Sequence, residues 1–242
     1  MKDLQGSEFY DNQAVFERYI NHRKWVENPN ELIEKPIFLE LAYGIKGNVL
    51  DLGCGYGDIS SELLSKGITR YTGIDSSSRM IALGKSQIKD NSVELIKSNV
   101  EDWEYGKSRY DWVISRLVFH YIADLEKTML KIYQGLKENG KLLFSVEHPV
   151  ITSSINLPRN EGKKQDWRVD QYFELGVRVQ EWMGNRVIKY HRSIEDYWRM
   201  VKLAGFIIEG IKEGCPQEAY FLTREEYERR KRIPLFLYYQ GG

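Results

Sequence analysis

An apolar run that ends directly in a glycine-rich turn constrains this chain more than any other feature. Val49–Leu52 is followed by Gly53, Gly55 and Gly57, and a helix-like segment begins at Asp58. A β-type run, a glycine turn and a helix in this order are typical of the opening unit of a doubly wound sheet. Because ligands of such sheets bind beyond the carboxyl ends of the strands, the turn marks the expected binding edge.

Further β-type runs and helical patterns alternate through the first part of the chain. Strands are expected at 48–52, 71–74, 93–97, 110–114 and 141–146. Helices are expected at 58–65 and 76–89, and a third runs from Leu125 to a stop at Asn139-Gly140. This alternation predicts an α/β fold with a doubly wound, mostly parallel sheet.

The later residues follow a different pattern. The runs 176–183 and 186–191 flank Gly184-Asn185, which predicts a hairpin. Ser193 and Asp196 form a capping box for a helix that reaches residue 204. Strands at 206–211 and 235–239 bring the sheet to seven, and a helix at 223–232 carries mixed charges that favour a solvated face. We predict one domain over 1–242, with an N-terminal helical cap at 1–45 and a hairpin or lid inserted after strand five at 150–192.

Composition argues against several functional classes. Lys+Arg and Asp+Glu both number 35, so the net charge is zero and neither nucleic acid nor a membrane surface is an expected partner. Cys54 and Cys215 make no disulfide framework, which favours a reduced, cytoplasmic location. The first residues lack a signal-peptide core, and no apolar run approaches the ~20 residues of a membrane helix.

The charges beside the glycine turn indicate which ligand it serves. A dinucleotide fingerprint would place its third glycine at position 58, where this chain has Asp58, and the G-K-[ST] of a P-loop is absent. Asp51 and Asp58 would repel a pyrophosphate but attract a cation. S-adenosylmethionine carries an ammonium and a sulfonium and no phosphate, so it matches this charge pattern.

Several motifs carry a resemblance to a known family. The chain reads VLDLGCGYG from Val49 and YTGIDSS from Tyr71, and later KSNVED, SRLVFHY and LLFSVEHP. In these stretches it resembles the class I S-adenosylmethionine-dependent methyltransferases, in particular the methyltransferase type 11-like group that acts on small molecules. The resemblance implies a Rossmann-like methyltransferase fold and S-adenosylmethionine as cofactor. It is strong over about residues 10–150 and weaker toward the C-terminus.

The resemblance also implies a set of cofactor-binding positions. An acid at the end of the second strand is expected to take both ribose hydroxyls, and the loop after the third strand is expected to contact adenine, with an asparagine where aspartate is usual. An arginine of the N-terminal segment is a candidate partner for the methionine carboxylate, with exposure to solvent as the alternative. In chain order the positions are Tyr19, Arg23, Asp51, Gly53, Cys54, Gly55, Asp75, Ser76, Met80, Asn99, Val100 and Ser115.

Histidines are the natural candidates for a general base, which methyl transfer needs only when the nucleophile starts protonated. His120 follows strand four and His148 follows strand five, so both are expected at the ligand edge. Each is a candidate catalytic residue or an ordering residue of the rim. His191 on the hairpin and His22 in the N-terminal region are further candidates. No metal site is expected.

The inserted segment is expected to cover the methyl acceptor. Its aromatic rings suit a flat acceptor, or an amine through cation–π contact, although they also suit a hairpin that buries its own side chains. These aromatic and basic residues are Trp167, Tyr172, Phe173 and Trp182 with Lys163, Lys164, Arg168 and Arg178.

The predicted activity is methyl transfer to O, N or S of a small-molecule acceptor by a monomer or homodimer. A nucleic-acid methyltransferase is one alternative, but the loop after strand four reads Ser115-Arg116-Leu117-Val118 instead of the (N/D)-P-P-(Y/F/W) of base-methylating enzymes. A non-catalytic cofactor-binding or scaffold protein on the same fold is the other.

Overall fold

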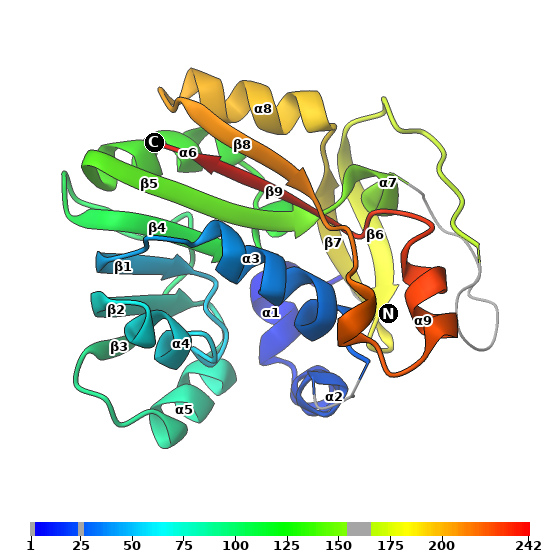
Figure 1. The fold of residues 1–242 in the computed structure, drawn as a ribbon, viewed down its shortest axis with the longest axis horizontal. Helices are drawn as coiled ribbons and strands as arrows, with labels where there is room; N and C mark the ends of the chain where they lie inside the picture. Colours follow the sequence, from blue (N-terminus) through cyan, green and yellow to red (C-terminus); the bar gives the residue numbers. More distant parts are fainter. Residues whose placement is uncertain (1–2, 24–26, 154–165) are drawn as a thin grey trace.

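A seven-stranded sheet in the order β3-β2-β1-β4-β5-β9-β8 forms the centre of the molecule (Figure 1). The computed structural model describes residues 3–23, 27–153 and 166–242. Strands β1 to β5 are parallel, and β9 runs antiparallel to both β5 and β8. The predicted mostly parallel, doubly wound sheet is therefore confirmed. The strands are β1 (Gly47–Leu52), β2 (Ile68–Asp75), β3 (Val93–Lys97), β4 (Tyr110–Arg116), β5 (Leu136–Glu147), β8 (Ile208–Glu213) and β9 (Phe236–Gly241).

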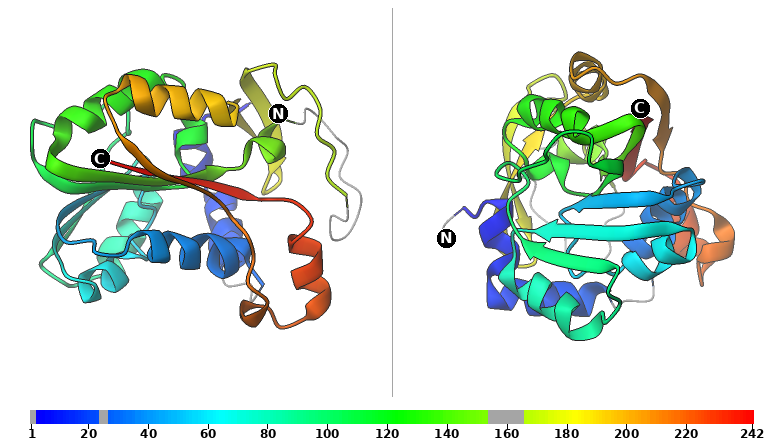
Figure 2. Two further views of the ribbon diagram at one scale, coloured as in Figure 1. Left: turned by 45° about the horizontal axis from the view of Figure 1, so that its top comes forward. Right: turned by 90° about the vertical axis from the view of Figure 1, so that its left-hand side faces the viewer.

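Helices cover both faces of this sheet (Figure 2). On one face lie α3 (Lys35–Leu41), α4 (Ser60–Ser65) and α5 (Ser78–Gln87), and on the other α6 (Leu125–Gly135) and α8 (Ile194–Leu203). Alternation along the strands supplies both cores, since Val49 packs into the first and Leu50 into the second.

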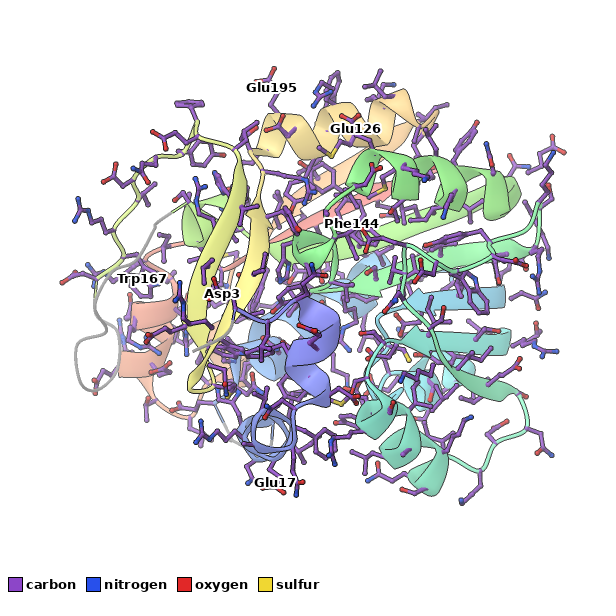
Figure 3. The ribbon with its side chains drawn as sticks, turned by 180° about the vertical axis from the view of Figure 1, so that it is seen from behind. Asp3, Glu17, Glu126, Phe144, Trp167 and Glu195 are labelled. Carbon is purple, nitrogen blue, oxygen red and sulfur yellow. The ribbon has the colours of Figure 1, made fainter. Side chains whose placement is uncertain are left out.

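The N-terminal segment and an inserted hairpin form a roof at the carboxyl ends of the strands. The segment contains α1 (Gly6–Asp11), α2 (Gln13–Arg23) and the π-helical turn η1 (Asn30–Glu34), and the hairpin consists of β6 (Gly176–Trp182) and β7 (Asn185–His191). The backbone of Leu4 bonds to Arg186 and Ile188 at 3.0 and 2.9 Å, and Phe9, Val15 and Val187 share a small buried core. Figure 3 shows the hairpin lying against α1, with Asp3 in front of it.

Short elements connect the sheet to the roof and to the far edge. They are the 3-10 turns η2 (Phe119–Tyr121) and η3 (Glu218–Tyr220) and the helices α7 (Pro149–Thr152) and α9 (Arg224–Arg230). The capping box at Ser193 and Asp196 is confirmed. Within the described ranges, no helix has the length and apolar character needed to cross a membrane.

Two turns differ from the prediction. Helix α6 ends at Gly135 rather than at Asn139-Gly140, because the chain leaves the helix to pair Leu136 with Tyr110 in β4. The Asn139-Gly140 pair instead lies in a register irregularity of β5. In the hairpin, the residues between the strands are Met183 and Gly184, both with positive φ, and Asn185 already pairs with Trp182. Arg18 of α2 donates to the Met183 carbonyl at 2.8 Å, so the turn is also fixed to the roof.

The solvated face predicted for the charged helix is wrong for three residues of α9. Glu226, Arg229 and Arg230 are buried. Glu226 accepts hydrogen bonds from both arginines, which lie three and four residues further along the helix. Because opposite charges within one turn neutralise each other, mixed-charge spacing is compatible with burial as well as with solvent.

Candidate active site

A cavity of about 280 Å³ lies under the roof, where β1, β2, β4 and β5 end. Almost all of the residues that the sequence suggested for cofactor binding or catalysis line it. Those residues are Tyr19, Arg23, Asp51, Gly53, Cys54, Gly55, Asp75, Ser76, Met80, Asn99, Val100 and His120. Ser115, His148 and the two further histidine candidates, His22 and His191, do not line it.

Asp75 is held at the end of β2 by the backbone of two loops. Its Oδ2 accepts the N–H of Gly55 at 2.9 Å and its Oδ1 accepts the N–H of Ser77 at 2.8 Å. Each carboxylate oxygen therefore keeps a lone pair for a further donor. Burial raises the pKa of Asp75 to about 6, against the effect of these backbone hydrogen bonds.

Asp51 presents an unused acceptor in the interior. Its Oδ2 accepts the Tyr71 hydroxyl at 2.5 Å, while its Oδ1 is buried and meets no hydrogen-bond donor in the described part of the chain. Burial raises the pKa of Asp51 to about 7. A buried carboxylate oxygen without a donor is costly, so its presence at a cavity wall points to a cationic or hydrogen-bond-donating ligand.

The backbone N–H groups of the glycine turn donate to acceptors within the protein. The N–H groups of Gly53 and Cys54 both bond to the Ile74 carbonyl, at 2.8 and 2.9 Å, and that of Gly55 bonds to Asp75. An anion-binding turn would aim these groups at the ligand. The geometry therefore agrees with the sequence argument that this turn serves a cation and not a phosphate.

The glycines are required by the close approach of the chain. A Cβ on Gly53 would lie 2.2 Å from a Val118 methyl group, and the φ of Gly53 is +73°. Gly55 has a φ of +58°, and a Cβ there would meet no atom within 4 Å, so its backbone borders open space in the cavity wall.

The far end of the cavity carries an amide and a thioether. The Asn99 Nδ2 donates to Asp102 at 2.7 Å, which turns the amide so that its Oδ1 remains an acceptor. Met80 is buried one turn into α5, whose first turn is capped by the Ser77 side chain. This end therefore offers a hydrogen-bond acceptor beside an apolar surface.

A buried ion pair that the sequence analysis did not select also lines the cavity. Glu34, fully buried at the end of η1, accepts hydrogen bonds from Arg116 at 2.6 and 3.0 Å and from the Ser145 hydroxyl at 2.6 Å. Arg23 pairs with Glu31 and Asp58, each at 2.5 Å. In the sequence, the only indication that Glu34 is buried was its place in an apolar helical stretch, between Ile33 and Ile37.

Another part of the cavity wall contains His120 and Glu147. The Glu147 N–H donates to His120 Nδ1 at 3.4 Å, and burial lowers the pKa of His120 to about 3. The ring is therefore neutral, and its Nε2 carries the hydrogen. Both Glu147 oxygens contact the Lys189 ammonium, at 2.6 and 2.7 Å. His120 is thus a hydrogen-bond donor in this state rather than a base.

Ser115 and the other histidines have structural partners elsewhere. The Ser115 hydroxyl donates to the Leu52 carbonyl at 2.9 Å. His148 caps α7 through Nδ1, and its Nε2 lies 3.0 Å from Glu213. His191 bonds to Thr152 and to the Tyr172 carbonyl, and His22 packs edge-on against Trp182.

Of the aromatic residues expected in the lid, Trp182 lines the cavity. Phe173 is exposed, and Trp167 stacks under Arg232 beside α9, where Figure 3 labels it. Lys163 and Lys164 fall outside the described residues. Within the described ranges, no group of three or more His, Cys, Asp or Glu side chains is arranged to hold a metal ion.

Comparisons with known proteins agree with this geometry. The model of the methyltransferase domain family matches residues 50–144. A solved structure from Listeria monocytogenes, whose description assigns it provisionally to the S-adenosylmethionine-dependent methyltransferases, is 31% identical over 86% of this chain and 95% of that one, with a TM-score of 0.77. A solved S-adenosylmethionine-dependent methyltransferase from Mesorhizobium loti is 27% identical over 86% of this chain and 96% of that one, also with a TM-score of 0.77. The malonyl-[acyl-carrier protein] O-methyltransferase of Acetivibrio thermocellus is 25% identical over 93% of this chain and 75% of that protein.

The fold and the cavity first define a class, the doubly wound α/β enzymes that bind a ligand at the carboxyl edge of the sheet. Within that class, the chain belongs to the S-adenosylmethionine-dependent methyltransferases, and S-adenosylmethionine is its cofactor.

Proposed function

We propose that this enzyme transfers the methyl group of S-adenosylmethionine to O, N or S of a small-molecule acceptor. The observation that carries the proposal is the buried Asp51 oxygen without a donor at the cavity wall. When bound, S-adenosylmethionine supplies an electrophilic methyl carbon on a sulfonium centre.

The residues of the cavity fit this cofactor in their chemistry. Asp51 Oδ1 would accept from the ammonium, and the remaining lone pairs of Asp75 would accept from the two ribose hydroxyls. Asn99 Oδ1 would accept from the adenine amino group, while Met80 would pack on the ring. Tyr19 and Arg23 would cover the methionine end from α2.

Aromatic side chains of the roof would hold the acceptor and exclude water. The Tyr10 and Tyr121 hydroxyls lie 3.2 Å apart, and Trp182 of the hairpin completes this part of the lining. Their task is to orient the nucleophile toward the methyl carbon, because an activated leaving group leaves mainly alignment and desolvation to the protein.

Thermal melting with three adenosine-containing ligands tests the cofactor assignment. We expect saturating S-adenosylmethionine to raise the melting temperature, because a ligand that binds the native state alone must stabilise it. NAD and ATP at the same concentration are expected to leave it unchanged. Stabilisation by NAD or ATP without any by S-adenosylmethionine would contradict the proposal.

Cofactor affinity is expected to fall as the solution becomes more acidic. Burial raises the pKa of Asp51 to about 7 and that of Asp75 to about 6, and only the ionised carboxylates attract the ammonium and accept from two hydroxyls. Affinity is therefore highest near pH 7.5 and should decrease about tenfold or more by pH 5.5, where Asp51 would be largely protonated. The ligand's own α-amino group can only gain positive charge as the pH falls, so its titration would not cause this decrease.

Isothermal titration calorimetry at pH 7.5, 6.5 and 5.5 measures this effect. The Asp51→Asn variant should bind more weakly at pH 7.5 and should show a shallower pH dependence, since one of the two titrating carboxyls is gone. Equal dissociation constants at the three pH values in the wild-type enzyme would refute the roles given to both carboxylates.

A further inference from the structure

Glu147 is a charged side chain that reaches the acceptor end of the cavity. It is the last residue of β5, it lines the cavity, and its side chain keeps 24% of its exposure. Both of its oxygens contact the Lys189 ammonium, at 2.6 and 2.7 Å. A carboxylate has about four lone-pair positions, so two remain for another donor after Lys189 has taken two.

Lys189 stands behind Glu147 and not in the cavity. Its side chain is 3% exposed, it comes from β7 of the hairpin, and its ammonium lies over the Tyr121 ring, 5.6 Å from the centroid. Because the carboxylate and the ring surround this cation, the charge that faces the acceptor is the negative one.

The surroundings of Glu147 place it beside the cofactor end. Burial, together with smaller contributions that include the Glu147 and Asp75 carboxylates, raises the pKa of the Tyr10 hydroxyl. Tyr10 also contacts both regions directly, because its hydroxyl lies 3.2 Å from that of Tyr121 and its backbone carbonyl accepts the hydroxyl of Ser77, two residues after Asp75, at 3.1 Å. His120 accepts the backbone N–H of Glu147 at Nδ1, so the neutral ring keeps its Nε2–H as a donor.

We propose that Glu147 accepts a hydrogen bond from the nucleophilic atom of the methyl acceptor, and that Lys189 is the residue that positions it. This inference rests on the proposed function. An acceptor atom that carries a hydrogen, in a hydroxyl or an amine, satisfies the free lone pairs of Glu147. A carboxylate acceptor would meet a like charge there, a thioether has no hydrogen to donate, and a thiol is only a weak donor. The acceptor class is therefore a hydroxyl or an amine.

The nature of the product tests the acceptor class. Wild-type enzyme is incubated with methyl-labelled S-adenosylmethionine and a bacterial extract of small metabolites, and the labelled product is treated with mild alkali. A methyl ether or methylamine, which retains its label, is expected. Release of labelled methanol, which marks a methyl ester, would overturn the inference, as would a sulfur-methylated product.

Variants of Glu147 test its contact with the acceptor. On the product so identified, Glu147→Gln is expected to lower kcat/KM for the acceptor by about 10- to 100-fold, the loss typical of a charged hydrogen-bond acceptor. Glu147→Asp keeps the charge but withdraws the carboxylate from the acceptor, so a similar loss is expected. It replaces Glu147→Gln in the test if that variant does not fold. The matched control is Glu209→Gln, which removes an acid from an exposed pair with Lys141, and it should behave as wild type.

The pH profile separates positioning by Lys189 from a merely structural tie. The titratable groups that face Glu147 are Lys189 of β7, His120 and Tyr121 of η2, Tyr10 of α1 and Tyr197 of α8. Burial raises the pKa of Glu147, but the Lys189 ammonium, which also hydrogen-bonds to the carboxylate, outweighs burial and holds that pKa below its ordinary value.

Lys189→Met removes the main charge that opposes the effect of burial on the pKa of Glu147, so Glu147 should protonate at higher pH. The acid limb of kcat/KM, measured at saturating S-adenosylmethionine, is expected to move toward neutral pH, and Lys189→Arg should restore the wild-type limb. A lower rate with an unmoved limb would overturn the positioning role.

Cofactor binding distinguishes the two levels of the proposal. Glu147→Gln and Lys189→Met are expected to bind S-adenosylmethionine within about twofold of wild type, because neither residue belongs to the cofactor end. A wild-type enzyme that does not bind S-adenosylmethionine would overturn the proposed function. Normal cofactor binding with wild-type turnover in Glu147→Gln would overturn this inference alone.

Discussion

Asp75→Ala should weaken the binding of S-adenosylmethionine by about 100-fold or more, the largest effect on cofactor binding that we expect. The substitution leaves the two ribose hydroxyls without their acceptors, and each hydrogen bond to a charged group contributes about 1.5–3 kcal/mol. It also frees the N–H groups of Gly55 and Ser77, which Asp75 holds at 2.9 and 2.8 Å. The variant is therefore expected to lack the acceptor for the ribose hydroxyls and to hold the glycine turn less firmly in place.

Calorimetry with a matched variant tests this expectation. Asp90 also accepts a backbone N–H, from Ser92 at 2.8 Å, but it lies in an exposed turn. Asp90→Ala should leave the dissociation constant for S-adenosylmethionine unchanged. The comparison shows whether the loss in Asp75→Ala is specific to that position. An Asp75→Ala enzyme that binds the cofactor as tightly as wild type would show that the ribose acid is another residue.

Glu34→Gln is expected to lower the free energy of unfolding by about 3 kcal/mol, the largest effect on stability. Arg116 donates to Glu34 at 2.6 and 3.0 Å, and Glu34 has no exposed surface. Removing one partner of a buried pair leaves the other charge without compensation, which typically costs about 3–5 kcal/mol. The lower end applies here because the Arg116 side chain, at 11% exposure, borders the cavity.

Chemical denaturation gives the free energy, and the melting temperature should fall by about 6–12 °C for a chain of this size. The exposed pair of Arg70 and Glu94, 2.8 Å apart, supplies the control. Glu94→Gln is expected to change stability by less than about 1 kcal/mol, because water already screens that pair. Equal stability of Glu34→Gln and wild type would contradict the assigned role of the pair.

Local patterns were sufficient for much of the fold. The capping box at Ser193 and Asp196 depends on residues three apart, and the turn at Gly53 and Gly55 depends on consecutive backbone angles. Such signals involve neighbours in the chain, so they can be recognised without knowing the tertiary structure. The end of α6 could not be recognised in this way, because Leu136 leaves the helix for a partner in β4.

The cavity shows the same division. Asp51 and Asp75 were predicted because each ends a strand or lies beside the glycine turn, and the carboxyl ends of parallel strands meet at one edge. His148 also follows a strand, but its ring turns toward Glu213 and caps α7 instead of reaching the cavity. Position along the chain located the edge, but it did not decide which side chains face inward.

The sequence by itself determined the alternating α/β order, the glycine turn and the carboxylates beside it, because these depend on short-range spacing and charge. Only the tertiary structure brought Arg116 to Glu34 and Lys189 to Glu147, pairs separated by 82 and 42 residues. Such partners are chosen by which elements pack together and by the need to compensate each buried charge, and neither is visible in local sequence.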